Sequence, residues 1–225
     1  TQVQPSSQNA ILFHDQSLKW GEGLPRWILE ALTLFEPCTP LPLGALQRFA
    51  KFDDQAPRNK IKKREVLEAL NDVEDQLQGL ELESGVKLSY KSFAEYCRDE
   101  VLGAEDMLDV MERVVDWLAR DEGAESASLI IAVLRYWGDD DLNHPDDLRK
   151  SVLQLPAALA KGERAKLLFD IYHELRVHDG TLACALHCLE LASEQGHSDA
   201  MGDLGWRLLH GDDVPADVAR GQELL

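Results

Sequence analysis

Hydrophobic residues recur three and four positions apart along most of this chain, which is the spacing of one face of an α-helix. From residue 104 onward the pattern comes in short stretches separated by polar turns, and it predicts successive helices without strands. The predicted apolar stripes are Met107–Leu118, Leu129–Trp137, Leu148–Leu155, Leu167–Leu175, Leu182–Ala192 and Ala200–Leu208. Pro145 is expected to open the third of these helices, and Gly162 separates it from the fourth.

The first hundred residues predict a different order of elements. Apolar stripes suggest three helices, and two alternating segments follow them. The helical stripes are Leu24–Phe35, Leu43–Ala50 and Val66–Leu77, and the alternating segments are Leu80–Glu83 and Val86–Tyr90. Ser84-Gly85 between these segments is a two-residue hairpin signal. Three helices followed by a hairpin is the order of a winged helix.

The last stretch, Asp179 to Leu225, has the clearest helix ends. Gly196 and Gly211 follow the two apolar stripes where a left-handed C-terminal residue is expected, a conformation that glycine adopts without a Cβ penalty. Ser198 and Asp217 are the predicted N-caps of the helices that come next. Helix backbones are also expected to approach closely at small residues. These are Ala192, Ala200 and Gly205.

The same stretch carries a repeat pattern. It reads A-S-E-Q-G-H-S-D-A from Ala192 to Ala200, and then has Leu204-Gly205, Gly211, Val214-Pro215 and Asp217. It resembles a Sel-one-like repeat, a relative of the tetratricopeptide repeat, in which A-A-x-x-G-x-x-x-A, L-G, G, V-P and D stand at these places. Ser193 replaces the second alanine. Asp179 and Asp217 are equivalent points 38 positions apart, a length typical of solenoid repeats.

This resemblance implies a right-handed solenoid of helix pairs whose concave groove binds a protein or peptide. A single repeat cannot bury its apolar face, and three or more are usually needed. We therefore expect further repeats after Leu225 in a longer protein.

A second resemblance covers roughly residues 20–102. It rests on Leu41-Pro42-Leu43-Gly44-Ala45-Leu46, on Leu67-Glu68-Ala69-Leu70, on the hairpin, and on the run from Tyr90 to Tyr96, Y-K-S-F-A-E-Y. These resemble the winged-helix segment of the NACHT/STAND-type signalling ATPases, where the corresponding run is H-K-S-F-x-D-[FY]. Tyr90 replaces the family histidine. The chain has no G-x-x-x-x-G-K-[ST] phosphate loop, so an ATPase core would have to lie upstream of it.

Together these patterns predict a mainly α fold: a winged-helix-like subdomain with a small β-hairpin, followed by an α-α helical repeat solenoid. The expected organisation is a polar tail over residues 1–19, the winged-helix-like domain over 20–103, degenerate helical pairs over 104–178 and the Sel-one-like repeat over 179–225.

The charge is unevenly spread. The net charge is −18 at pH 7; residues 1–103 carry 12 basic and 16 acidic side chains, and residues 104–225 carry 11 and 25. This asymmetry supports a boundary near Gly103 and argues against phosphate binding by the second half. No apolar run is long enough to span a membrane, and residues 1–9 do not read as a signal peptide. Four scattered cysteines suggest reduced thiols, so we expect a cytoplasmic protein.

One basic cluster favours an alternative. Five positive charges lie close together at the start of the predicted third helix, which enters the major groove in DNA-binding winged helices. They are Arg58, Lys60, Lys62, Lys63 and Arg64. Acidic residues follow on the same helix, and they would repel phosphate. A nucleic-acid-binding winged helix with a helical oligomerisation tail is therefore the second hypothesis, and a solvated loop explains the cluster better.

Metal and catalytic sites are weakly supported. Cys184, His187 and Cys188 can share one helix edge, and His173 or His178 could complete a zinc site, but the spacing is not that of a zinc finger. Buried structural cysteines explain the pattern better. No hydrolase or zincin motif occurs. We therefore predict no catalytic residue, no metal and no cofactor. The favoured function is non-enzymatic protein–protein interaction and regulation, as the winged-helix and sensor-repeat part of a STAND-type ATPase.

Overall fold

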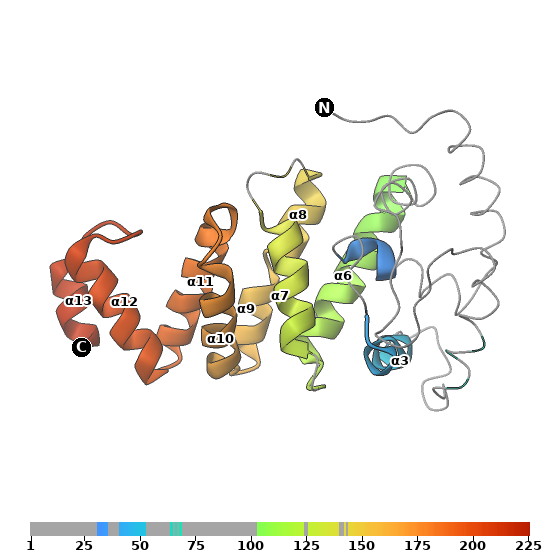
Figure 1. Cartoon of the computed structure of the whole chain (residues 1–225), viewed down its shortest axis with the longest axis horizontal. Coiled ribbons are helices and arrows are strands. Elements are labelled where there is room, and N and C mark those ends of the chain that lie inside the picture. Colours follow the sequence, from blue (N-terminus) through green and yellow to red (C-terminus); the bar gives the residue numbers. More distant parts are fainter. Residues whose placement is uncertain are drawn as a thin grey trace. The chain divides into compact units, whose positions relative to one another are not determined.

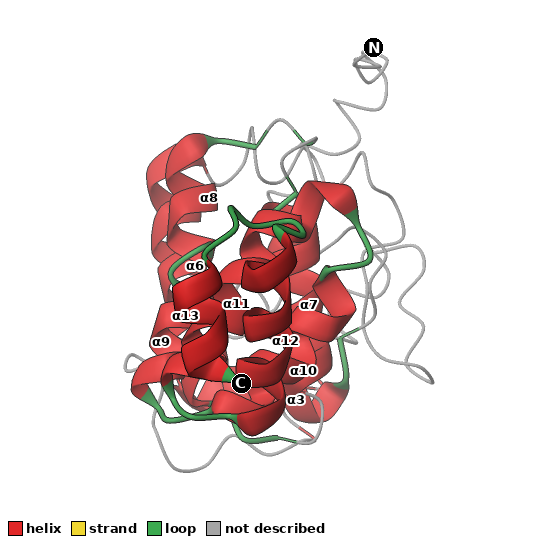
Figure 2. Ribbon diagram, turned by 90° about the vertical axis from the view of Figure 1, so that its left-hand side faces the viewer, coloured by secondary structure: helices red, strands yellow, loops and turns green. Residues whose placement is uncertain are grey.

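The computed structural model describes residues 31–35, 41–52, 64, 66, 68, 103–123, 126–139, 142 and 144–225. These residues are mainly helical and form no strand (Figure 2), which confirms the predicted helical class for this part of the chain. The helices are α3 (Leu43–Phe52), α6 (Gly103–Arg120), α7 (Ser126–Trp137), α8 (Asp146–Val152), α9 (Leu155–Lys161), α10 (Ala165–Leu175), α11 (Leu182–Glu194), α12 (Ser198–His210) and α13 (Val218–Leu224). The predicted hairpin over residues 80–90 lies outside the described residues, so the winged helix stays a prediction.

Contacts divide the chain into two compact units. The first comprises Thr1–Trp117 with Asp121–Val133, and the second comprises Leu118–Arg120 with Leu134–Leu225. The boundary predicted near Gly103 and the two further segment limits stay predictions. None of the helices in the described part combines the length and apolar character that a membrane crossing requires.

A partly buried ion pair connects α3, α6 and α7 in the first unit. Arg48 on α3 donates from Nε to Asp121, at 2.7 Å, and Asp121 follows the end of α6. Ser126, the first residue of α7, donates its hydroxyl to the same carboxylate at 3.0 Å. Phe49 packs its ring 5.1 Å from that of Trp117. One acidic side chain therefore connects the middle of α3, the end of α6 and the start of α7, with an aromatic pair beside it.

The helix expected over Leu148–Leu155 is in fact two helices, so that prediction was wrong. Pro145 does open α8, but α8 ends at Val152, and α9 begins at Leu155. The reason is Pro156, which has no backbone N–H and cannot continue the ladder of the preceding helix. It stands in the first turn of α9, where a missing donor has no consequence.

From α9 onward, helices that are neighbours in sequence pack against each other. α10 packs against α11, α11 against α12, and α12 against α13, and α9 contacts both α10 and α11 (Figure 1). The centre of this stack is apolar and contains Leu168, Ile171 and Tyr172 from α10, with Leu189 and Ala192 from α11. α10 with α11, and α12 with α13, therefore form two successive helix pairs.

The predicted helix ends hold with one exception. Gly196 and Gly211 have φ of 76° and 71°, and Asp217 caps α13 by accepting from the Arg220 amide at 3.0 Å. The N-cap of α12, however, is His197, whose Nδ1 accepts from the Ala200 amide at 3.3 Å. Ser198 was predicted as this cap and is instead the first helical residue. An unprotonated imidazole nitrogen supplies the acceptor that serine usually supplies.

The predicted buried faces hold for α12 and shift for α11. Ala200, Leu204, Gly205 and Leu208 are all buried, as expected. In α11, however, Leu182 and Leu186 are only half-buried, and other residues are buried in their place. The buried set is Cys184, Ala185, Cys188, Leu189, Ala192 and Ser193. The buried face of α11 is therefore the one that carries most of its small residues, because α11 packs between α10 and α12.

Candidate interaction site

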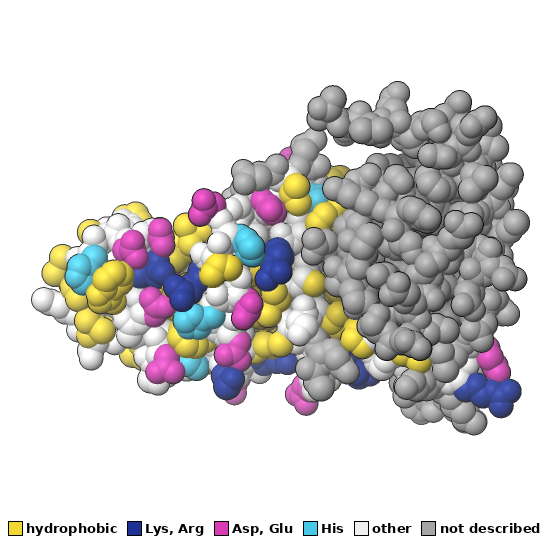
Figure 3. All heavy atoms as spheres, viewed as in Figure 1, with side chains coloured by type: hydrophobic (Ala, Val, Ile, Leu, Met, Phe, Trp, Pro, Cys, Tyr) yellow, Lys and Arg dark blue, Asp and Glu magenta, His cyan; other side chains and the backbone are white. Residues whose placement is uncertain are grey.

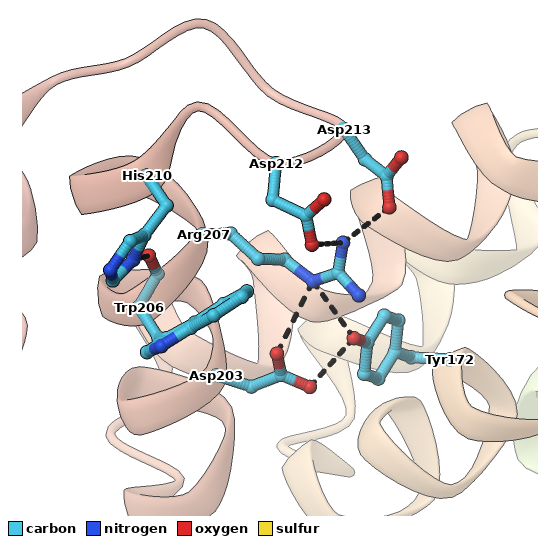
Figure 4. A network of polar contacts seen from close by, with 7 residues as sticks. All are labelled: Tyr172, Asp203, Trp206, Arg207, His210, Asp212 and Asp213. Carbon is cyan, nitrogen blue, oxygen red and sulfur yellow. Dashed lines mark hydrogen bonds and ion pairs between the residues drawn. The ribbon is translucent and has the colours of Figure 1, made fainter.

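The strongest polar feature of the second unit is a buried arginine. Arg207 lies in the last turn of α12 with a side chain only 7% exposed. We call the Arg207 network the set of Tyr172, Asp203, Arg207, Asp212 and Asp213 (Figure 4). A buried cation is expected only where carboxylates and hydrogen bonds compensate for its loss of water.

The network connects three segments. Arg207 Nε donates to the Tyr172 hydroxyl on α10 at 3.1 Å and to Asp203, one turn earlier on α12, at 3.2 Å. Its Nη1 donates to Asp212 at 3.5 Å and to Asp213 at 2.5 Å, in the loop that leads to α13. One side chain therefore joins the first helices of both pairs and the loop within the second pair.

Tyr172 closes the network from the side of α10. Its hydroxyl donates to Asp203 at 2.6 Å while accepting from Arg207. Burial, together with the hydrogen bond to Asp203, raises the pKa of Tyr172 to about 12. The phenol therefore keeps its proton at neutral pH and serves as donor and acceptor in the network.

Arg207 stays charged for a related reason. Burial works against its charged form, but the hydrogen bonds that it donates to Asp213 and Tyr172 outweigh burial and raise its pKa. The guanidinium also lies 5.8 Å from the Tyr172 ring centroid, and that of Arg176 lies 5.7 Å from it. The three carboxylates exceed the one buried positive charge, and their side chains are 26% to 49% exposed. The network therefore compensates the buried positive charge and leaves negative charge at the surface.

Aromatic and histidine side chains accompany the network on the same helices. The Phe169 ring on α10 lies 4.5 Å from that of His173 and 4.7 Å from that of His197, the cap of α12. On α12, Trp206 stacks on His210 with 4.5 Å between ring centroids. Trp206 remains 49% exposed. The surface of α10 and α12 therefore mixes aromatic rings with carboxylates.

The basic cluster of the nucleic-acid hypothesis is described only at Arg64. Arg64 donates to Glu68 one turn later at 2.7 Å, and this exposed pair offsets its charge. Arg58, Lys60, Lys62 and Lys63 lie outside the described residues. The nucleic-acid hypothesis therefore stays a prediction.

The candidate zinc residues are divided between interior and surface. Cys184 and Cys188 are buried free thiols, whereas His187 is exposed, as are His173 and His178. The hydrogen bond with Cys184, together with burial, raises the pKa of Cys188 well above its usual value. Among the described residues, no three His, Cys, Asp or Glu side chains are grouped so that they could hold a metal ion.

Comparison with known proteins finds no relative of this chain. The chain matches no family model, no curated protein and no solved structure.

The sequence pattern does not predict the Arg207 network as a whole. The spacing of Asp203 and Arg207, four positions apart on a predicted helix, was a usable signal for a pair. Tyr172 could not be found in this way, because it lies 35 positions before Arg207. Its position beside Arg207 follows only from the packing of the two helix pairs.

Proposed function

We propose that this chain is a non-enzymatic protein-interaction module, and that its successive helix pairs present a polypeptide-binding surface on α10 and α12. The observation that carries the proposal is the Arg207 network, which joins the first helices of the two pairs and leaves carboxylates and aromatic rings exposed around it. Exposed aromatic rings are enriched at protein interfaces, and they support this proposal.

The stacking of neighbours supports this proposal. Each of the helices from α10 to α13 packs against the next one along the chain, as in repeat proteins, where stacked pairs create extended binding surfaces. Asp179 and Asp217, the equivalent points of the Sel-one-like pattern, lie just before α11 and α13, the second helices of the two pairs. The proposed solenoid is built from such pairs.

We place this module, as a further part of the proposal, in the regulatory and sensor region of a STAND-type signalling ATPase. The support is the order of the Leu41–Tyr96 pattern followed by repeats. In that setting, ligand binding on the repeats would be transmitted through the winged helix to an upstream nucleotide switch. A full-length sequence with no phosphate loop upstream of Thr1 would remove this part and leave the interaction module intact.

The interaction proposal is tested by selecting short random peptides, displayed on phage, against the whole chain. Amide hydrogen exchange then maps where each selected peptide protects the protein. We expect protection on α10 and α12. Selection of no peptide, or protection confined to other helices, would argue against the module.

A further inference from the structure

We propose that the exposed face of α12 binds a peptide segment that carries lysine or arginine side chains. Trp206 is the main contact for these cationic side chains. We call this face the Trp206 face and define it by Asp199, Gly202, Trp206 and His210. The inference rests on the proposed function, because it names the partner class for one part of the interaction surface.

The Trp206 face is a single stripe of the helix. Its members are spaced three, four and four positions apart, so they follow one another along one side of α12. Arg207 and Asp203 lie on the neighbouring side, turned toward Tyr172, and Gly205 lies on the side turned toward α13. Figure 4 shows Trp206 and His210 on the other side of Arg207 from Tyr172.

Trp206 is held in place although it is exposed. Its ring stacks on His210 with 4.5 Å between centroids and 28° between planes, and His210 Nδ1 lies 2.7 Å from the Trp206 carbonyl oxygen. With one neighbour already stacked on it, the indole loses little conformational freedom when a ligand arrives. Tryptophan is also the best aromatic partner for a lysine or arginine cation.

The helix surface next to Trp206 is open at Gly202. A Cβ added at Gly202 would meet nothing within 4 Å, whereas one added at Gly205 would lie 3.1 Å from the Gly221 carbonyl oxygen. Gly202 is one turn before Trp206, so the ring stands next to a stretch of helix without a side chain. A ligand side chain can therefore approach the backbone of α12 there and still contact the indole.

The charge around this face selects a cationic ligand. Residues 198–225 carry six acidic and two basic side chains, a net charge of −4. Both basic groups are paired, Arg207 within its network and Arg220 with Glu190 at 3.8 Å. Asp199 is exposed on the face itself, and Asp212 and Asp213 remain 49% and 38% exposed near it. Figure 3 shows carboxylates spread among hydrophobic and histidine side chains over the α10–α13 region, with some lysine or arginine side chains between them. Such a surface attracts positive segments and repels acidic ones.

The test uses peptides selected from the random library against the whole chain, measured by fluorescence polarisation. We expect the selected sequences to be enriched in lysine and arginine, and raised salt to weaken binding. Trp206→Ala should reduce affinity by about tenfold or more, as for an aromatic hot spot. Gly202→Gln should reduce it similarly while the helix stays folded, because the added Cβ meets no atom within 4 Å and the rest of the side chain occupies the space next to Trp206.

The matched control separates a specific site from general attraction to an acidic protein. Glu194 on α11 is exposed like Asp199, so Glu194→Gln removes the same charge away from the face. Asp199→Asn should weaken binding by more than Glu194→Gln does. Equal losses in the two variants, with no effect of Trp206→Ala or Gly202→Gln, would overturn the inference.

The remaining outcomes are also decisive. Selected peptides that are acidic or uncharged but still protect α12 would overturn the inference and support the proposed function. A library that yields no binding peptide would overturn both. Dimerisation of the chain that is lost in Trp206→Ala, detected by analytical ultracentrifugation, would show that a second copy covers this face and would overturn the inference.

Discussion

The two helix pairs of the second unit hold together in different ways. In the pair α10/α11, large side chains fill the space between helices, with Tyr172, Leu168 and Leu189 fully buried. In the pair α12/α13, glycines meet: a Cβ at Gly221 would lie 2.9 Å from the Gly205 carbonyl oxygen. The first pair is stabilised mainly by apolar burial, and the second by close backbone approach.

This difference is accompanied by little burial of α13, in which Gly221 is the buried residue. Backbone contact at Gly205 and Gly221 needs no long side chains, and Val218 in the first turn of α13 remains 54% exposed. The Arg207 network compensates by connecting α12 and its loop to α10. The second pair therefore depends on polar contacts that the first pair does not need.

Leu189→Ala tests the apolar pair and should have the largest effect. Leu189 is fully buried, and deleting a buried leucine side chain costs about 2–5 kcal/mol through lost burial and a cavity. Urea denaturation followed by circular dichroism measures the loss. The half-buried Leu186 provides the control, since Leu186→Ala should cost less. Equal losses would show that α11 does not bury the face seen in the structure.

Arg207→Met tests the connection between the pairs. It keeps a long apolar stem but leaves the Tyr172 hydroxyl and three carboxylates without their shared partner. Breaking such a buried network costs about 2–4 kcal/mol, less than for a fully buried pair because the carboxylates can regain water. Hydrogen exchange should show α12 and α13 opening more readily than α11. A uniform change across all four helices would contradict the proposed connection.

Gly221→Ala tests the glycine contact in the second pair. The added Cβ would press on the Gly205 carbonyl oxygen and on the Leu209 side chain, and overpacking of this kind costs about 1–3 kcal/mol. Gly202→Ala on α12 is the matched control, because its Cβ meets no neighbouring atom. That control should stabilise the helix by about 0.5–1 kcal/mol. If Gly221→Ala and Gly202→Ala changed the free energy of unfolding in the same direction, the close approach of the two helices at Gly221 would be wrong.

Tyr172→Phe tests how the stability supplied by the network depends on pH. The pKa of Tyr172 is raised from 10.0 to about 12 in the folded chain. Its contribution to stability is therefore complete below pH 10 and is lost as the pH rises through 12. Near neutral pH the variant should be less stable by about 1–2 kcal/mol. Between pH 10 and 12 the unmodified chain should lose more stability than the variant, and parallel losses would exclude Tyr172 as the titrating group.

His197→Ala tests the start of the second pair and should have the smallest effect. Losing the Nδ1 acceptor at the N-terminus of α12 costs about 0.5–1 kcal/mol. Ser198→Ala should change stability by much less, because Ser198 lies inside the helix. Thermal unfolding of the two variants under identical conditions makes the comparison. A larger loss for Ser198→Ala would restore serine as the cap.

Local rules were sufficient for much of the second unit. Helical periodicity located the helices from α10 to α12, and glycine preferences located the left-handed residues at Gly196 and Gly211. Asp217 acts as the predicted cap. These features depend on neighbours within a few positions, so a sequence pattern contains them. The same rules missed the break before α9, where Pro156 had to be weighed against a continuous apolar stripe.

The Trp206 face could be recognised only in part. The sequence shows that Gly202 and Trp206 share one side of a helix, because they are four positions apart. It does not show that this side is the open one, since glycine and tryptophan are equally compatible with a packed interface. Exposure was decided by α13, which meets α12 at Gly205 instead.

The amino-acid sequence by itself determined the helical class of the described residues, most of the helix limits, and the acidic balance of the second half, because each follows from residue type and short-range spacing. Only the tertiary structure decided that Arg207 is buried and that Tyr172 is its partner. It also decided that His197 caps α12 and that the glycines of α12 and α13 meet at Gly205 and Gly221. The physical reason is that burial and long-range partners depend on how the helix pairs stack, which no local pattern specifies.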